Sequence, residues 1–185
     1  MNQQMSLEDQ LREMYGRAAY THKTHEKMAD GYVVRYKAIK SLEIVLSALS
    51  AGSLLLAVWG DSRLATILGA VLSTLLLGLN LYFKEASLGE QAQIHAETAS
   101  KLWGIRERLL SLLIDMDDGR APEKVREERD RLNQELENLY KTAPRTNAKA
   151  YAKAQAALKS NEELFFSADE LNKMLPEKLR RPGRS

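Results

Sequence analysis

Residues 44–83 read IVLSALSAGSLLLAVWGDSRLATILGAVLSTLLLGLNLYF and hold two uncharged apolar runs, Ile44–Gly60 and Leu64–Phe83, joined by the polar link Asp61-Ser62-Arg63. At 1.5 Å of rise per residue, a helix over the second run is about 30 Å long, the thickness of a bilayer's hydrocarbon core. That run contains eight leucines, and Asn80 is its only strongly polar residue. The stretch predicts two membrane-spanning helices in a tight hairpin.

The first run is shorter and less apolar than the second, because three serines and a glycine interrupt its leucines. As the partner of the second run it is still a credible span. The alternative is a water-soluble helical bundle with an unusually apolar central hairpin. Helices of soluble bundles keep a polar face, and Leu64–Phe83 has none, so the sequence favours the membrane.

Basic residues flank the hairpin unevenly. Lys84 follows the second run and the link carries only Arg63. The five basic residues nearest to the first run on its N-terminal side are Lys23, Lys27, Arg35, Lys37 and Lys40. Lysine and arginine accumulate on the cytoplasmic side of membrane proteins. We therefore expect both termini in the cytoplasm, the link on the outer side, and the cytoplasmic (inner) membrane as the location.

The composition excludes several classes of function. The chain of 185 residues has a formal net charge of only +2, which gives little reason to expect nucleic-acid binding. It has no cysteine, so disulfides, thiolate catalysis and zinc–thiolate sites are excluded. The sequence also has no phosphate-binding glycine loop, Walker motif or nucleophile elbow. We expect a protein that is not an enzyme and carries no cofactor.

Outside the hairpin the sequence shows no strand signals, so the expected fold is all-α. Residues 1–43 are predicted to form an N-terminal cytoplasmic helix that starts at a Ser6–Asp9 capping box. Residues 84–159 are predicted to form a cytoplasmic helical region in which Pro122 opens a new helix. The second span is expected to run on into this region, with Gly89 as the position of any bend.

Residues 160–185 are predicted to hold short capped helices and a basic tail. Capping boxes are expected at Ser160 with Glu163 and at Ser167 with Glu170. They frame Leu164-Phe165-Phe166 and a short helix that follows. The tail from Arg180 to Arg184 is expected to be disordered.

Apolar seams run along Leu7–Ile39 and Leu88–Met116 at spacings of three and four residues. We expect these two helices to pack antiparallel, like the hairpin that they extend. Each seam is flanked by more apolar side chains than one partner needs, which predicts a homo-oligomer held together by the cytoplasmic helices. The candidate interface residues are Leu102, Leu109, Leu113, Tyr15 and Tyr36.

Polar side chains inside the apolar runs form two lines. Thr66, Ser73 and Asn80 are seven residues apart and share one face of the second span, whereas Ser47, Ser50 and Ser53 form a looser stripe on the first. One interpretation is that they join helices, because Gly69 and Gly78 belong to small-residue pairs that allow close packing. The other is that these six residues line a water path in an oligomer.

Three histidines and a group of aspartates are the residues that could hold a metal. His22, His25 and His95 lie on the two helices expected to pair, but their spacing favours hydrogen bonds between helices over a metal site. Asp115, Asp117 and Asp118 are typical of a solvated helix end. No metal site is predicted.

Two segments carry a family resemblance, YGRAAYTHKTHEKMADGYVVRYKAIKSLEIVLSALSAG (residues 15–52) and LYFKEASLGEQAQIHAETASKLWGIRERLLSLL (residues 81–113). They resemble the SLATT family of bacterial two-transmembrane effectors, which are associated with nucleotide-producing SMODS enzymes and with SLOG domains. The similarity covers roughly Leu7 to Tyr151. Positions typical of that family are Tyr20, His22, Glu90, His95 and Ala99.

The resemblance implies an effector of an antiviral, abortive-infection system that permeabilises the bacterial inner membrane when a partner reports infection. The implied partners are the lipid bilayer, other copies of the chain, and a nucleotidyltransferase, its nucleotide product or a reverse-transcriptase neighbour. The residues after Ser160 have no counterpart in the family pattern. The alternative function is a non-conducting membrane anchor that recruits a soluble partner through its cytoplasmic helices.

Overall fold

The computed structural model describes residues 6–60, 62–161, 163–164 and 166–180, and within them it is all-α, as predicted. Two helical segments, one on each side of the link, are long and apolar enough to cross a membrane. The elements are α1 (Leu7–Gly60), α2 (Arg63–Ala86), α3 (Leu88–Asp117), α4 (Pro122–Thr142), α5 (Ala148–Lys159), α6 (Ala168–Met174) and the short 3-10 helix η1 (Glu177–Leu179).

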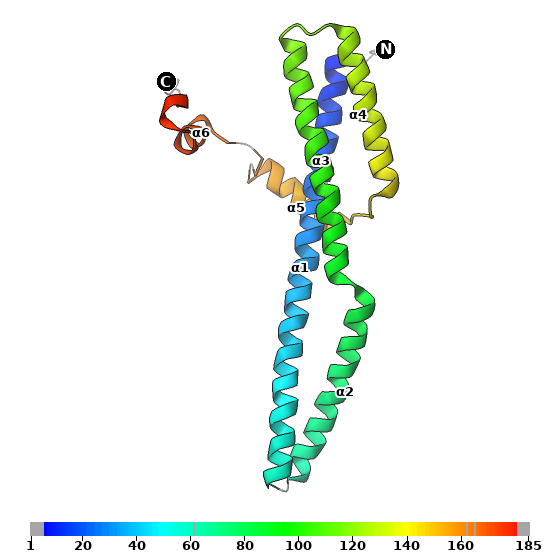
Figure 1. Ribbon diagram of the computed structural model, residues 1–185, viewed down its shortest axis with the longest axis vertical. Coiled ribbons are helices and arrows are strands. Elements are labelled where there is room, and N and C mark those ends of the chain that lie inside the picture. The colour runs from blue at the N-terminus through cyan, green and yellow to red at the C-terminus, as the bar shows by residue number, and fades with distance from the viewer. Residues whose placement is uncertain (1–5, 61, 162, 165, 181–185) are drawn as a thin grey trace.

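Helix α1 is a single helix of 54 residues that contains both the predicted N-terminal helix and the first apolar run (Figure 1). It starts at the predicted capping box: the Asp9 amide donates to Ser6 Oγ at 3.1 Å, and the Ser6 hydroxyl donates to the Asp9 carboxylate at 2.7 Å. No proline interrupts it. The helix therefore connects the apolar hairpin rigidly to the polar bundle.

The second span does not run on unbroken. The helix ends at Ala86 and restarts at Leu88, and Ser87 between them has a left-handed backbone with a φ of 43°. The predicted bend at Gly89 was wrong by two residues, because the break falls on a serine, whose hydroxyl donates to the Lys84 carbonyl at 3.4 Å. At this break the chain turns, so that α2 diverges from α1 while α3 lies along it (Figure 1).

Helices α1, α3 and α4 form a helical bundle beside the apolar hairpin, and the antiparallel pairing predicted for the two seams is confirmed (Figure 1). One core contains the fully buried side chains of Leu11 and Met14 of α1, Leu102 and Leu109 of α3, and Leu132 of α4. Pro122 opens α4 at its first turn, as predicted. The bundle thus has its own apolar core outside the membrane hairpin.

The C-terminal segment agrees with the sequence in part. Ser167 and Glu170 form both hydrogen bonds of a capping box at the start of α6, as predicted. The box predicted at Ser160 was wrong, because Ser160 is the C-cap of α5 and the Glu163 carboxylate binds lysines of α1. Phe165 and the tail residues from Arg181 onwards lie outside the described residues.

Candidate functional site

The two spans pack closely at Gly69 of α2. A Cβ atom at this position would lie 2.8 Å from Ser53 Oγ and 3.0 Å from Leu54 Cδ2, so a side chain there would crowd α1. Ala65, one turn earlier, is buried in the same contact. Small residues four apart are what close helix packing in membranes requires.

Five of the six candidate pore-lining residues have their hydroxyls satisfied within this hairpin. Ser50 and Ser73 pair across the two spans at 2.8 Å. The other three donate to carbonyl oxygens of their own helix or its cap: Ser47 to Glu43, Ser53 to Ser50, and Thr66 to Ser62. The structure therefore gives Ser50 and Ser73 a role in joining the spans, and it leaves no unpaired donor on the serine stripe of α1.

Asn80 is different. Its side chain is exposed on α2, and among the described residues none forms a hydrogen bond with its carboxamide. An amide in hydrocarbon without a partner costs several kcal/mol. In a bilayer, Asn80 therefore needs either water or a second chain.

The candidate interface residues divide into two groups. Leu102 and Leu109 are fully buried in the core of the single chain, and Leu113 and Tyr15 pack against that core. Tyr36 is partly exposed and its ring lies 5.3 Å from that of Phe83, where α1 meets the end of α2. In this conformation Leu102 and Leu109 are covered by α1 and α4. The spacing of apolar residues does not distinguish a seam that packs within one chain from a seam that forms an interface with another chain.

Other apolar side chains of α3 remain uncovered. Trp103, Leu110 and Ile114 are exposed, with Trp103 exposed by 51%. They lie beside the buried seam on the same helix. Together with Ile94, which is also exposed, they are apolar side chains of α3 that a second copy could contact without unfolding the bundle.

The three histidines form hydrogen bonds between α1 and α3. The Nδ1 atoms of His25 and His95 lie 2.8 Å apart, and His22 Nδ1 donates to the Ala99 carbonyl at 2.9 Å. Burial, together with the neighbouring imidazoles of His95 and His22, lowers the pKa of His25 to about 4. Burial also lowers the pKa of His95. Among the described residues there is no metal-ligand cluster, and the geometry fits the hydrogen-bonding interpretation.

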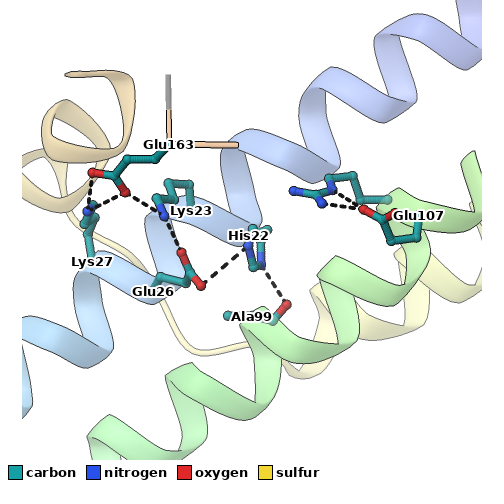
Figure 2. A network of polar contacts seen from close by, with 8 residues as sticks. His22, Lys23, Glu26, Lys27, Ala99, Glu107 and Glu163 are labelled. Carbon is teal, nitrogen blue, oxygen red and sulfur yellow. Dashed lines mark hydrogen bonds and ion pairs between the residues drawn. The ribbon is translucent and has the colours of Figure 1, made fainter. Parts of the chain in front are cut away.

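Sequence reasoning missed an ion-pair cluster that holds the C-terminal segment to α1. Figure 2 shows Glu163 reaching both Lys23 and Lys27, with Glu26 on the other side of Lys23. The buried Lys23 amine lies 2.8 Å from Glu163 and 2.7 Å from Glu26. Hydrogen bonds from Lys23 and Lys27 lower the pKa of Glu163 to about 2. No sequence signal links Glu163 to Lys27, which lies 136 residues earlier in the chain.

Comparison with known proteins gives one result. Residues 7–170 match the family described as SMODS and SLOG-associating 2TM effector domain family 4. No curated protein and no solved structure matches the chain. The match begins at the first residue of α1 and ends within α6, so it covers the hairpin, the bundle and the Glu163 contact. It extends beyond Tyr151, and the expectation that the residues after Ser160 have no counterpart in the family was wrong for the residues up to 170.

Proposed function

This chain belongs to the SMODS and SLOG-associating 2TM effector domain family 4, and from this premise we propose that it is a membrane effector that assembles with other copies and permeabilises the membrane. In this proposal α1 and α2 cross the bacterial inner membrane, and both termini are cytoplasmic. The chain performs no catalysis of its own. Its trigger is a partner or a nucleotide signal from the antiviral system in which it acts.

The observation that carries this proposal is the exposed carboxamide of Asn80. The serine and threonine hydroxyls of the two apolar runs are satisfied within one chain, whereas the Asn80 amide has no hydrogen-bond partner among the described residues. A single copy in lipid would leave this group unsatisfied. An oligomer in which Asn80 faces a water path satisfies it and supplies the path.

A second function has an observation of its own. The segment after α5 exposes apolar side chains that the single chain does not cover, namely Phe166, Leu171, Met174 and Leu179. A membrane anchor that recruits a soluble partner would use such a surface. In that case the hairpin would hold the protein in the bilayer and would conduct nothing.

Flux through reconstituted vesicles separates these two functions. Purified full-length chain is incorporated into liposomes loaded with a self-quenched dye and with a potassium gradient. A permeabilising effector releases the dye or dissipates the gradient, either on its own or after addition of the partner encoded beside it. If the partner binds to the vesicles and they still release neither dye nor potassium, the permeabilising function is excluded and the anchor function remains.

A further inference from the structure

A cavity of about 260 Å³ lies between α1 and the N-terminal half of α5. Three cations line it that have no ion-pair partner among the described residues: Arg35, Lys149 and Lys153. Lys27 lines it as well, with its amine bound to Glu163, and Asp30 is the one carboxylate among the described lining residues. The surplus of positive charge around a concave surface attracts an anion.

The position of α5 directs this cavity towards the membrane hairpin. At the start of α5, Asn147 Nδ2 lies 3.1 Å from Met28 Sδ, and one turn later Tyr151 stacks on Tyr20 at 5.9 Å. Helix α5 starts beside α1 and leads obliquely to the side, away from the hairpin, as Figure 1 shows. The cavity lies on the hairpin side of this contact, against the turns of α1 around Val34 and Arg35.

The distance to the membrane is short. Arg35 precedes the first residue of the apolar run, Ile44, by nine positions, which corresponds to about 13 Å along the helix. The headgroup layer on each side of the hydrocarbon core takes up roughly 5–7 Å of that distance. Arginine side chains extend several ångströms towards an interface, so Arg35 is within reach of lipid headgroups. Lys149 and Lys153 lie farther from the span, on α5, which starts beside Met28.

Apolar surface adjoins the cations. Val34 lines the cavity and is 66% exposed, and Val33, Tyr36 and Leu42 continue exposed apolar surface along α1 towards the span. This exposed apolar surface connects the cavity with the first span. The cavity thus offers cations on one side and apolar surface on the other, which is the arrangement that a phosphate on an acyl tail requires.

We propose that this cavity binds a phosphate-bearing anion, with Arg35, Lys149 and Lys153 as its ligands and an anionic lipid headgroup as the source that the adjoining apolar surface favours. A soluble phosphate compound shares the same chemistry and is the second source. The inference goes beyond the proposed function, because it concerns neither the conduction path nor the contact between copies. It holds equally for an effector and for an anchor.

The test compares two double variants of the full-length chain in detergent. Lys149→Gln/Lys153→Gln removes two cations of the cavity, and Lys101→Gln/Lys124→Gln removes two exposed lysines of α3 and α4 that do not line it. Native mass spectrometry measures retention of phosphatidylglycerol against phosphatidylcholine, and calorimetric titration measures binding of inorganic phosphate and pyrophosphate. Because all four lysines are exposed, both double variants should keep the thermal unfolding curve of the wild type. The substitution Arg35→Gln provides a second variant of the cavity.

Each juxtamembrane cation contributes roughly fivefold to the affinity for an anionic surface. We therefore expect the cavity variant to lose phosphatidylglycerol binding by about tenfold or more and the control to lose little. Loss of phosphate or pyrophosphate binding in the cavity variant, without a lipid preference, would support the site with a soluble source. Equal losses in both double variants, or no binding of any of these probes by the wild type, would overturn the proposal.

Discussion

The hydroxyl oxygens of Ser50 and Ser73 lie 2.8 Å apart, and this contact joins the two spans midway along the hairpin. Ser50 also reaches the Gly69 carbonyl at 3.4 Å, on the stretch of α2 that has no side chain to keep α1 away. The hairpin is therefore closed by small residues and by the polar contacts of Ser50 with α2. The other serine and threonine hydroxyls of the two runs bond to carbonyls of their own helix or its cap, which leaves the Asn80 carboxamide as the exception.

We predict that Gly69→Leu separates the spans, because even a Cβ at this position meets Ser53 and Leu54 within 3.0 Å. The chain has no cysteine, so the substitutions Ser50→Cys and Ser73→Cys report the distance cleanly. Oxidant should cross-link this pair in the wild-type background and fail to do so with Gly69→Leu. Gly52→Leu is the matched control, since nothing lies within 4 Å of its added carbon. Equal cross-linking in all backgrounds would contradict the packing described here.

The topology gives a second prediction. Basic residues precede the first span and the link holds only Arg63, so Ser62 should face outward. In intact cells, cysteine substituted at Ser62 should react with an impermeant maleimide, and cysteine substituted at Ser111 in the bundle should react only after the cells are opened. Asn2 and Ser185, at the chain ends that are predicted to be cytoplasmic, lie outside the described residues, so Ser111 serves as the inner position. Labelling of Ser111→Cys in intact cells would show that the orientation is the reverse of the predicted one.

Two neighbouring leucines of α3 should respond differently to substitution. Leu109 is fully buried, so Leu109→Ala should destabilise the bundle by about 2–5 kcal/mol. Leu110 is exposed, so Leu110→Asp should leave the unfolding temperature close to that of the wild type while weakening association between copies. Circular dichroism and the light-scattering mass of the detergent-solubilised particle measure the two effects. If the double substitution Leu110→Asp/Ile114→Asp leaves the particle mass unchanged, the contact between copies lies on another surface.

Local signals allowed the sequence to predict much of this fold. Capping boxes at Ser6 and Ser167 and the proline at 122 act within one helical turn, and their geometry is as predicted. The break at Ser87 was not predictable in this way, because a serine in a left-handed conformation has no sequence signature. Nor was the contact of Glu163 with Lys23, since the same spacing from Ser160 also fits a capping box.

For the candidate site, the periodicity of the sequence predicts which side chains share a helix face, but it does not predict their partners. A spacing of seven places Thr66, Ser73 and Asn80 on one face, but it does not say which of them find partners inside the hairpin. Ser73 does so through Ser50, and Thr66 through the Ser62 carbonyl. Likewise, the apolar seam of α3 contains Leu109, which the chain itself covers. Burial by α1 and α4 depends on tertiary packing that the pattern of a single helix does not encode.

The paired imidazoles of His25 and His95 predict a pH dependence of stability. The pKa of His25 falls from its usual value of 6.5 to about 4 in the folded chain, chiefly because the ring is buried. A group with a lowered pKa stabilises the folded state fully above pH 6.5, and this contribution is lost as the pH falls towards 4, because only the unfolded chain takes up the proton.

Between pH 6.5 and pH 5 the loss amounts to about 2 kcal/mol, or roughly 4–8 °C in unfolding temperature for a chain of this size. His25→Gln/His95→Gln should flatten the curve in this range. Glu163, whose pKa is lowered to about 2, contributes its own loss only below its usual value of 4.5. A wild-type unfolding temperature that stays constant from pH 7 to pH 5 would contradict the prediction.

Asn80 distinguishes a pore wall from a contact between helices. If its carboxamide faces water, Asn80→Leu should keep expression and oligomer mass but abolish ion flux, because a ring of leucines dewets a narrow path. If the carboxamide instead bonds to a neighbouring chain, the same substitution should dissociate the oligomer, because the polar contact is lost and lipid accommodates leucine. Thr74→Val is the matched control, since Thr74 bonds to the Ala70 carbonyl and lies off the line of Asn80. Flux that survives Asn80→Leu at full oligomer mass would move the water path to another face, and the stripe of Ser47, Ser50 and Ser53 would then be the next surface to substitute.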